Sequence, residues 1–344
     1  FDVIFTDLVM SDIDGLEVLA RAKKALPDSE VIVVTGHASV PTAVLAMQQG
    51  AFNFLEKPVT PDKLRAIAEK AVDKVRLRRQ NLELSQRLDE KFGFEGIVFT
   101  SKKMQAVIDR LKRVAPKDAT VLITGENGTG KEVVARLTYA LSRRKLEPFI
   151  AVNCAAISET LLESELFGHV KGAFTGASAN RDGAACIADG GTLFLDEICE
   201  MGLELQKKLL RFIQTGSFRK VGSNTLEQVD VRFVCATNRN PIVEVSEGRF
   251  REDLFYRLHV VPVSMPPLRE REDDVLMIAN HFLRQFSTAA GKSFEGFSED
   301  AAVAIQRYPW PGNIRQLQNT MQQVVVLNDG PLVDVQTLPG SITS

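Results

Sequence analysis

Short apolar runs alternate with amphipathic stretches from the first residue to about residue 70. Three apolar runs predict strands, at Val3–Thr6, Glu30–Thr35 and Phe52–Leu55. Apolar positions recur at helical spacing between and after these runs, which predicts helices at Leu16–Ala25, Val40–Gly50 and Pro61–Val75. This alternation of strands and helices predicts an α/β fold, with a parallel sheet and helices on its faces.

A strongly charged stretch follows, from about residue 74 to residue 94. Leu77, Leu84 and Leu88 lie on one stripe of a helix, with Asn81 between them. We therefore expect a connecting helix. Two hypotheses remain open for it: a short coiled coil with a second copy of the chain, or a single solvated linker helix.

The rest of the chain repeats the α/β pattern on a larger scale and ends in a helical part. We expect a first α/β domain over 1–73, a helical linker over 74–94, an α/β core over 95–264, and a helical lid with a tail over 265–344. The pattern starts abruptly in a strand at Phe1 and trails off after Asn328. Both ends look cut, so we expect a fragment of a longer protein.

Composition narrows the function classes. The 344 residues carry a formal net charge of -2, so no broad basic surface indicates nucleic-acid binding. The four cysteines lack metal-site spacing, which is typical of free thiols in a reducing cytosol. No apolar run reaches the roughly 18 residues of a membrane helix, and no signal peptide precedes Phe1. We expect a cytoplasmic protein without a membrane partner.

A glycine-rich loop lies between a predicted strand, Ala119–Thr124, and a predicted helix. Its pattern, G-x-x-x-x-G-K, predicts a phosphate-binding loop, because glycines let backbone N–H groups converge on phosphates at the positive end of a helix. The residue that usually holds magnesium, Ser or Thr, is replaced by glutamate, so a plain glycine-rich turn is the alternative. The expected ATP-binding residues are Gly125, Glu126, Asn127, Gly128, Thr129, Gly130, Lys131 and Glu132.

Two acids at the end of a second apolar strand support nucleotide hydrolysis. The run Gly190–Leu195 ends in Asp196 and Glu197, which is the Walker B arrangement. We expect Asp196 to hold Mg²⁺, through water, and Glu197 to polarise the attacking water. Together the two motifs predict an ATPase with ATP and Mg²⁺ as its ligands.

Two asparagines also end predicted strands. Asn238 follows the strand that starts at Val231, where an amide can sense the γ-phosphate. Asn153 ends the strand FIAVN and is expected to hold Glu197 in an idle orientation. Turn chemistry is the alternative for such strand ends.

A set of motifs in fixed order now points to one family. GENGTGKE, VNCAA, ELFGH, KGAFTGA, GGTLFLDEI, ATN, FREDLFYRL and WPGNIRQL occur from about Glu95 to Asn328. This region resembles the AAA+ central domain of the NtrC-type, sigma-54-dependent activators. Glu132 is usual in that family. The resemblance implies an ATPase that remodels the closed promoter complex of sigma-54 RNA polymerase.

The family's signature hexapeptide has a physical rationale. Two glycines and small alanines bracket an aromatic residue, which predicts a flexible loop with an exposed tip. An exposed aromatic side chain favours a partner that covers it; a phenylalanine folded back into the core is the alternative. The residues that the resemblance assigns to sigma-54 contact are Gly172, Ala173, Phe174, Thr175, Gly176 and Ala177.

Three arginines acquire roles from the resemblance. It implies that Arg251 and Arg257 are arginine fingers that reach the γ-phosphate of a neighbouring subunit, and that Arg315 is the second sensor in the helical lid. Fingers supplied in trans require a head-to-tail ring, a hexamer or a heptamer, with a dimer as the inactive form. Surface salt bridges with Glu252 or Asp253 are the alternative for the fingers.

The first domain resembles a two-component receiver, whose sheet is flavodoxin-like. Asp7 would be the phosphoacceptor, with Thr35 and Lys57 as its partners, and the Lys57–Pro58 bond would be cis. A sensor histidine kinase is the implied partner. Receivers hold magnesium with an acidic pair on their first strand, which does not precede Phe1, so we expect this chain not to accept phosphate as it stands.

The resemblance also implies promoter or enhancer DNA as a partner, through a C-terminal helix-turn-helix that this chain does not contain. Two other functions are weighed against sigma-54 activation. One is an AAA+ remodeller of other clients, against which KGAFTGA argues. The other is a nucleotide-bound DNA-binding repressor without turnover, against which Lys131, Asp196 and Glu197 argue.

Overall fold

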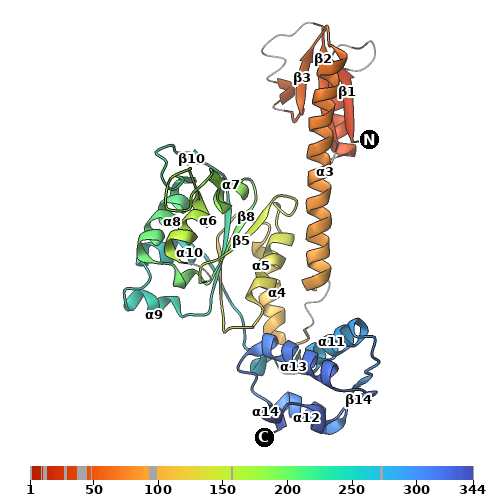
Figure 1. Ribbon diagram of the computed structural model, residues 1–344, viewed down its shortest axis with the longest axis vertical. Coiled ribbons are helices and arrows are strands. Elements are labelled where there is room, and N and C mark those ends of the chain that lie inside the picture. Colours follow the sequence, from red (N-terminus) through yellow and green to blue (C-terminus); the bar gives the residue numbers. More distant parts are fainter. Residues whose placement is uncertain are drawn as a thin grey trace. The chain divides into compact units, whose positions relative to one another are not determined.

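The computed structural model describes residues 2–8, 10, 14–26, 29–36, 45–47, 49–92, 99–155, 158–271 and 274–343; for residues 77–92 and 343 it describes the backbone alone. The chain divides into two compact units, residues 1–93 and 94–344 (Figure 1). Part of the predicted helix 40–50 and the side chains of Leu77, Asn81, Leu84 and Leu88 lie outside the described residues.

The first unit is built on a parallel three-stranded sheet in the order β1-β2-β3. The strands are β1 (Val3–Asp7), β2 (Glu30–Thr35) and β3 (Asn53–Glu56). Helix α1 (Gly15–Ala25) begins at Asp14, whose side chain accepts a hydrogen bond from the Leu16 N–H group. Helix α3 runs without a break over Pro61–Phe92. The predicted α/β pattern is confirmed here.

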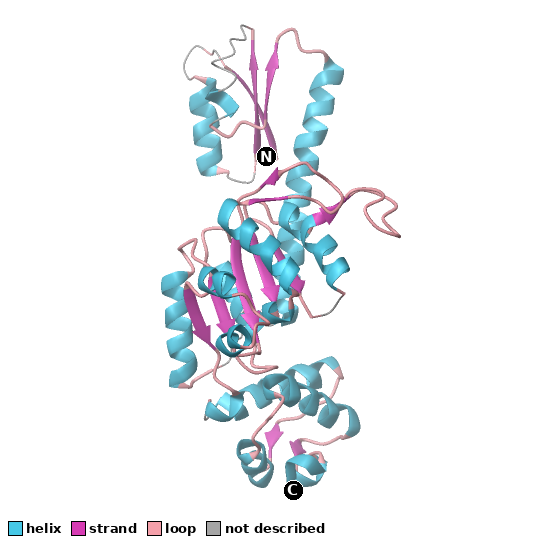
Figure 2. Ribbon diagram, turned by 90° about the vertical axis from the view of Figure 1, so that its left-hand side faces the viewer, coloured by secondary structure: helices cyan, strands magenta, loops and turns pink. Residues whose placement is uncertain are grey.

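The second unit contains a five-stranded parallel sheet in the order β12-β4-β11-β8-β5 (Figure 2). Each strand end therefore meets strand ends that are distant in sequence. The strands are β4 (Val121–Thr124), β5 (Phe149–Asn153), β8 (Thr192–Asp196), β11 (Arg232–Thr237) and β12 (Val261–Ser264).

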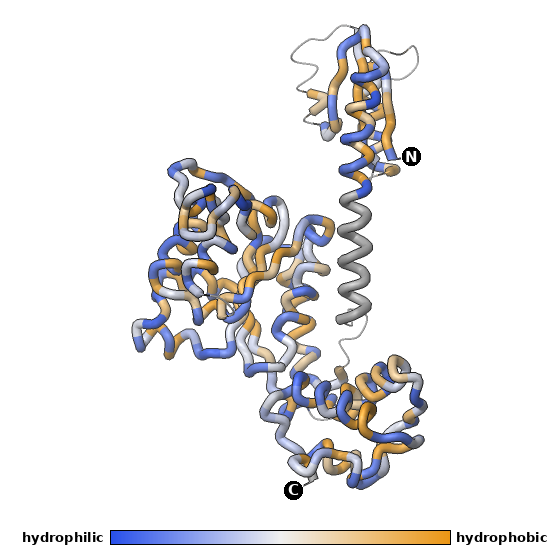
Figure 3. The backbone as a smooth tube through the Cα atoms, in the orientation of Figure 1, coloured by the Kyte–Doolittle hydropathy of each residue, from blue (hydrophilic) through white to orange (hydrophobic). Residues whose placement is uncertain are grey.

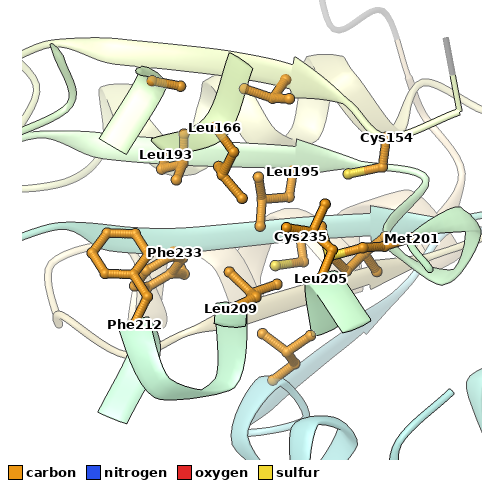
Figure 4. Packing of buried hydrophobic residues seen from close by; sticks show 14 of the residues in the cluster. Cys154, Leu166, Leu193, Leu195, Met201, Leu205, Leu209, Phe212, Phe233 and Cys235 are labelled. Carbon is orange, nitrogen blue, oxygen red and sulfur yellow. The ribbon is translucent and has the colours of Figure 1, made fainter. Parts of the chain in front are cut away.

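Helices cover both faces of this sheet, because its strands are apolar on both sides. Leu193 and Leu195 face one layer and Phe194 faces the other. On the first side lie α6 (Glu159–Phe167), α7 (Ala184–Ile187), α8 (Leu203–Thr215) and α10 (Glu252–Leu258); on the other lie α4 (Lys102–Val114) and α5 (Lys131–Ala140). Figure 4 shows Leu205, Leu209 and Phe212 of α8 among the residues of the first core.

The C-terminal part is helical and has its own core. Its elements are the 3₁₀ turn η2 (Leu268–Glu270) and the helices α11 (Asp274–Ala289), α12 (Glu299–Arg307), α13 (Asn313–Leu327) and α14 (Gly340–Thr343). Hydrophobic and hydrophilic positions alternate along these helices (Figure 3). Trp310 is fully buried in the core, and its indole N–H group donates to the Ile305 carbonyl at 2.8 Å. We call this part the lid.

Short strand pairs complete the second unit: β6 (Gly168–His169) with β7 (Arg181–Asp182), β9 (Ser217–Phe218) with β10 (Glu227–Gln228), and β13 (Gly296–Phe297) with β14 (Leu332–Val333). The four cysteines are free thiols, as predicted. Across the described part of the chain, every helix is too short or too polar to cross a bilayer.

Candidate ATP site and partner-contact residues

The glycine-rich loop connects β4 to α5, as the sequence predicts. Gly125 donates its N–H group to the Thr237 carbonyl at 3.2 Å, which fixes the start of the loop to β11. Gly128 and Gly130 have φ angles of 77° and 96°, which favour glycine. A Cβ atom on Gly128 would lie 2.3 Å from the Gly312 carbonyl oxygen, so the loop and the lid approach each other too closely for any side chain at this position.

Lys131 is buried at the first turn of α5 and points back across the loop. Its ammonium group lies 3.0 Å from the Gly125 carbonyl oxygen and 3.3 Å from a carboxylate oxygen of Glu197. The neighbouring Glu132 is exposed and pairs with Arg136 along the same helix, at 2.9 Å. The structure thus brings Lys131 to the Walker B acids and places the Glu132 carboxylate in an ion pair on the helix surface.

Asp196 and Glu197 occupy the carboxyl end of β8, next to the loop. Burial, and the negative charge of Glu197 beside it, raise the pKa of Asp196. Glu197 has a φ angle of 52°, a left-handed conformation that is uncommon for a residue with a side chain. Strained backbone of this kind gathers at functional sites, where the surroundings hold it in place.

Asn238 follows β11 and joins the acids to the loop. Its backbone N–H group donates to Glu197 at 2.9 Å, and its side-chain amide donates to the Asn127 side chain, also at 2.9 Å. Asn153 lies across from Asp196 in the β5–β8 register, and its side chain accepts from the Ala155 N–H group at 2.9 Å. Its role in holding Glu197 stays a prediction.

The three arginines lie in different surroundings. Arg251 precedes α10 and forms a two-point ion pair with Asp253, at 2.7 and 3.0 Å, within the same chain. Arg257 is exposed on α10. Arg315 is exposed on α13, with its backbone close to Gly128 of the loop. These positions are compatible with the predicted roles and do not test them.

Sequence reasoning missed a set of lid residues that bind the loop. Arg269 pairs with Glu126 at 2.6 and 2.9 Å, and the Asn313 side chain donates to Glu126 at 3.1 Å. Arg271 donates to the Thr129 carbonyl at 2.7 Å. Asn313 lies inside the motif WPGNIRQL. The motif therefore indicated this segment of the lid, but not that Asn313 binds Glu126.

The hexapeptide 172–177 forms a closed turn rather than an extended tip. Gly172 donates to the Ala177 carbonyl at 2.9 Å, and Ala177 donates to the Phe174 carbonyl at 3.0 Å. Phe174 is only partly exposed, because its ring packs edge-on against His169 with the ring centroids 5.1 Å apart. In this conformation Phe174 lies between the exposed tip that the sequence predicts and the alternative of a phenylalanine buried in the core. Burying part of the ring reduces its apolar contact with water, while Thr175 and Gly176 are exposed.

In the first unit, three predicted residues meet at the carboxyl ends of three neighbouring strands. Asp7 ends β1, Thr35 ends β2, and Lys57 follows β3. The Lys57 ammonium group forms an ion pair with the Asp7 carboxylate. The peptide bond between Lys57 and Pro58 is cis, as predicted.

A phosphate loop between β4 and α5, strand-end acids beside it and a helical lid that contacts it define a P-loop ATPase of the AAA+ class. Three family models match the chain: a sigma-54 interaction domain over residues 97–264, an AAA+ ATPase lid domain over 269–344 and a response regulator receiver domain over 1–69.

Similar proteins cover nearly the whole chain. The regulatory protein LuxO of Vibrio vulnificus is 52% identical over 338 residues, which are 98% of this chain and 74% of that protein. The transcriptional regulatory protein ZraR of Klebsiella oxytoca is 45% identical over 343 residues, 100% of this chain and 76% of that protein. The crystal structure of NtrX from Brucella abortus in complex with ADP matches with a TM-score of 0.68 and 36% identity, covering 100% of this chain and 76% of that one.

The chain belongs to the family of sigma-54-dependent response regulators. It is an ATP-binding AAA+ ATPase that activates sigma-54-dependent transcription as part of a two-component system.

Proposed function

We propose that ATP hydrolysis takes place where the glycine-rich loop, β8 and β11 meet, and that a ring of subunits uses it to remodel the closed promoter complex. One observation carries the assignment of the site. The Lys131 ammonium group, the Glu197 carboxylate and Asn238 form a connected set, with contacts of 3.3 Å and 2.9 Å, although they come from three separate segments. Strand order alone brings them together.

The loop N–H groups and Lys131 bind the β- and γ-phosphates. Without nucleotide, the lysine ammonium group is paired with loop carbonyls and Glu197. A triphosphate offers it more negative charge, so ATP draws Lys131 from Glu197 and frees that carboxylate. Glu197 then orients the attacking water and accepts its proton, and ATP and water give ADP and phosphate. Asn238, bonded to both Glu197 and Asn127, reports the γ-phosphate to the loop.

The residues present fit Mg²⁺. Magnesium takes one or two carboxylates and completes its shell with phosphates and water, so the protein need not supply a full cage. In the described part of the chain, no three His, Cys, Asp or Glu side chains converge as a metal site. Asp196 would hold the ion. When bound, magnesium neutralises phosphate charge.

Arg251 and Arg257 complete the site of a neighbouring subunit in a ring of six or seven. Arg251 must first exchange its intrachain partner Asp253 for the neighbour's phosphate. Arginine fingers contribute roughly 10³–10⁵-fold in rate, so hydrolysis is tied to assembly. A dimer is the inactive form.

The 172–177 loop contacts sigma-54 through Phe174 and Thr175. Contact requires Phe174 to leave the His169 ring, since its edge-on packing there covers part of its surface. Asp7, with Thr35 and Lys57 beside it, is the proposed phosphoacceptor of the full-length protein, and a sensor kinase is the proposed phosphoryl donor. Promoter or enhancer DNA is a further proposed partner of the full-length protein. This chain spans about three quarters of the length of the relatives above.

The test is a pair of turnover measurements on the full chain with Mg·ATP. Lys131→Ala is expected to abolish binding of ATP, and Glu197→Gln to keep binding while slowing hydrolysis about 10²–10⁴-fold. Lys103→Ala, on the surface of α4, is the control. Hydrolysis at the wild-type rate in Glu197→Gln would contradict the assignment.

A further inference from the structure

The second residue of the glycine-rich loop carries a carboxylate that the lid holds. Both terminal nitrogens of Arg269 donate to Glu126, at 2.6 and 2.9 Å, and Asn313 adds a third bond at 3.1 Å. These hydrogen bonds, from Arg269 first and from Asn313 second, lower the pKa of Glu126 to about 2. Glu126 is therefore ionised at every physiological pH.

Lid contacts continue along the loop residue by residue. Asn313 also donates to the Asn127 carbonyl at 3.0 Å, and the Ile314 N–H group donates to the Gly128 carbonyl at 2.9 Å. Arg271 donates to the Thr129 carbonyl at 2.7 Å. Four consecutive loop residues are thus bonded to the lid.

Asn313 is built for this position. It is fully buried and has a φ angle of 51°, in the left-handed region that asparagine adopts more readily than most residues with a side chain. Its side-chain oxygen accepts from the Leu268 N–H group at 2.8 Å, so its amide nitrogen must face the loop. Arg315 follows two residues later on α13. The same segment places the Gly312 carbonyl and the Arg315 backbone next to Gly128.

The charge of Glu126 makes the contact between Arg269 and Glu126 relevant to ATP binding. The loop attracts a triphosphate through its N–H groups and Lys131, and Glu126 is a negative charge in the same loop. An unpaired carboxylate beside the phosphates weakens binding, whereas one that shares two hydrogen bonds with a guanidinium is largely neutralised.

We propose that Arg269 and Asn313 are positioning residues for ATP. Arg269 neutralises the Glu126 carboxylate and holds it toward the lid. Arg269 and Asn313 together hold the lid, including Arg315, against the loop. The proposal rests on the nucleotide site described under the proposed function. It goes further by assigning a charge-dependent part of ATP affinity to the Arg269–Glu126 ion pair between the lid and the loop.

The experiment measures KM and kcat for Mg·ATP, and the Kd of a fluorescent ATP analogue, on the full chain. Arg269→Ala raises Kd and KM about ten-fold, with most of the loss in KM rather than kcat. Arg269→Lys keeps the charge but loses one of the two bonds, and lies between Arg269→Ala and wild type. The double variant Glu126→Gln/Arg269→Ala recovers most of the affinity, because the repelling charge is gone.

A matched control is available one residue away. Glu270 pairs with Lys103 of α4 at 2.8 Å, a lid-to-core ion pair away from the loop. Lys103→Ala is expected to leave KM unchanged. Equal KM values for Arg269→Ala and Lys103→Ala would overturn the proposal, as would a double variant as weak as Arg269→Ala. Lys131→Ala separates the two levels: if it binds the analogue like wild type, the nucleotide site itself is misassigned.

Discussion

Replacing Gly128 by alanine tests how closely the lid sits on the nucleotide loop. The new Cβ atom would lie 2.3 Å from the Gly312 carbonyl oxygen and 3.1 Å from the Cβ atom of Arg315. Ordinary contacts begin at 3.4 Å, so loop and lid must separate by roughly 1 Å, because neither neighbour is the end of a flexible side chain. Gly128→Ala also carries the backbone strain of a φ angle of 77°.

Gly130→Ala is the matched control. Its φ angle is 96°, so it has a comparable backbone cost of about 1–2 kcal/mol, but its Cβ atom would meet only the end of the Ile314 side chain, at 3.8 Å. The difference between the two variants is therefore the clash with the lid. Overpacking of this kind costs about 1–3 kcal/mol, which lowers Tm by roughly 2–12 °C beyond the control in a unit of this size.

Differential scanning calorimetry of the nucleotide-free protein measures this difference. The transition of the second unit is identified as the one that ADP shifts upward, since a ligand stabilises the state that binds it. We expect Gly128→Ala to melt clearly below Gly130→Ala. Equal Tm values for the two variants would refute the close contact of loop and lid.

Three further predictions follow from the sites. Asp196→Asn raises the Tm of the nucleotide-free protein, with a gain in the free energy of unfolding of roughly 0.5–2 kcal/mol, and abolishes turnover. Folding raises the pKa of Asp196, so its charge destabilises the folded protein fully only above that pKa. Thermal scans should therefore show the stability gain of Asp196→Asn shrinking as the pH falls through the folded-state pKa. Glu197→Gln traps bound ATP, which filter binding detects as a stable complex without ADP release. Phe174→Ala keeps ATPase activity within about two-fold of wild type, because the 172–177 loop lies outside the phosphate site. The same variant no longer captures sigma-54 in a pulldown. Retained capture would contradict the assignment of the 172–177 loop.

Short sequence patterns predicted the parts of the site that lie at the end of a single strand or at the start of a single helix. The loop of Gly125–Lys131, the acids at the end of β8 and the strand-end position of Asn238 each follow from a short apolar run and its terminal residues. The parallel α/β fold follows from the same alternation. The receiver residues Asp7, Thr35 and Lys57 meet because carboxyl ends of parallel strands share one edge.

Contacts between distant segments could not be predicted in this way. Arg269 lies 143 residues from Glu126, and nothing in its neighbourhood marks it as the partner of a loop glutamate. The resting position of Phe174 depends on His169, which the β6–β7 pair presents to the loop. Composition indicated an aromatic tip, whereas tertiary packing decides whether that ring faces solvent or a neighbour.

ATPase activity per subunit, measured as a function of protein concentration, tests most directly that a neighbour completes each site. We expect the rate per subunit to rise steeply as the protein assembles, and Arg251→Ala and Arg257→Ala to remain at the low rate of the dilute protein at every concentration. A rate per subunit that stays constant from dilute monomer to full assembly would contradict the account.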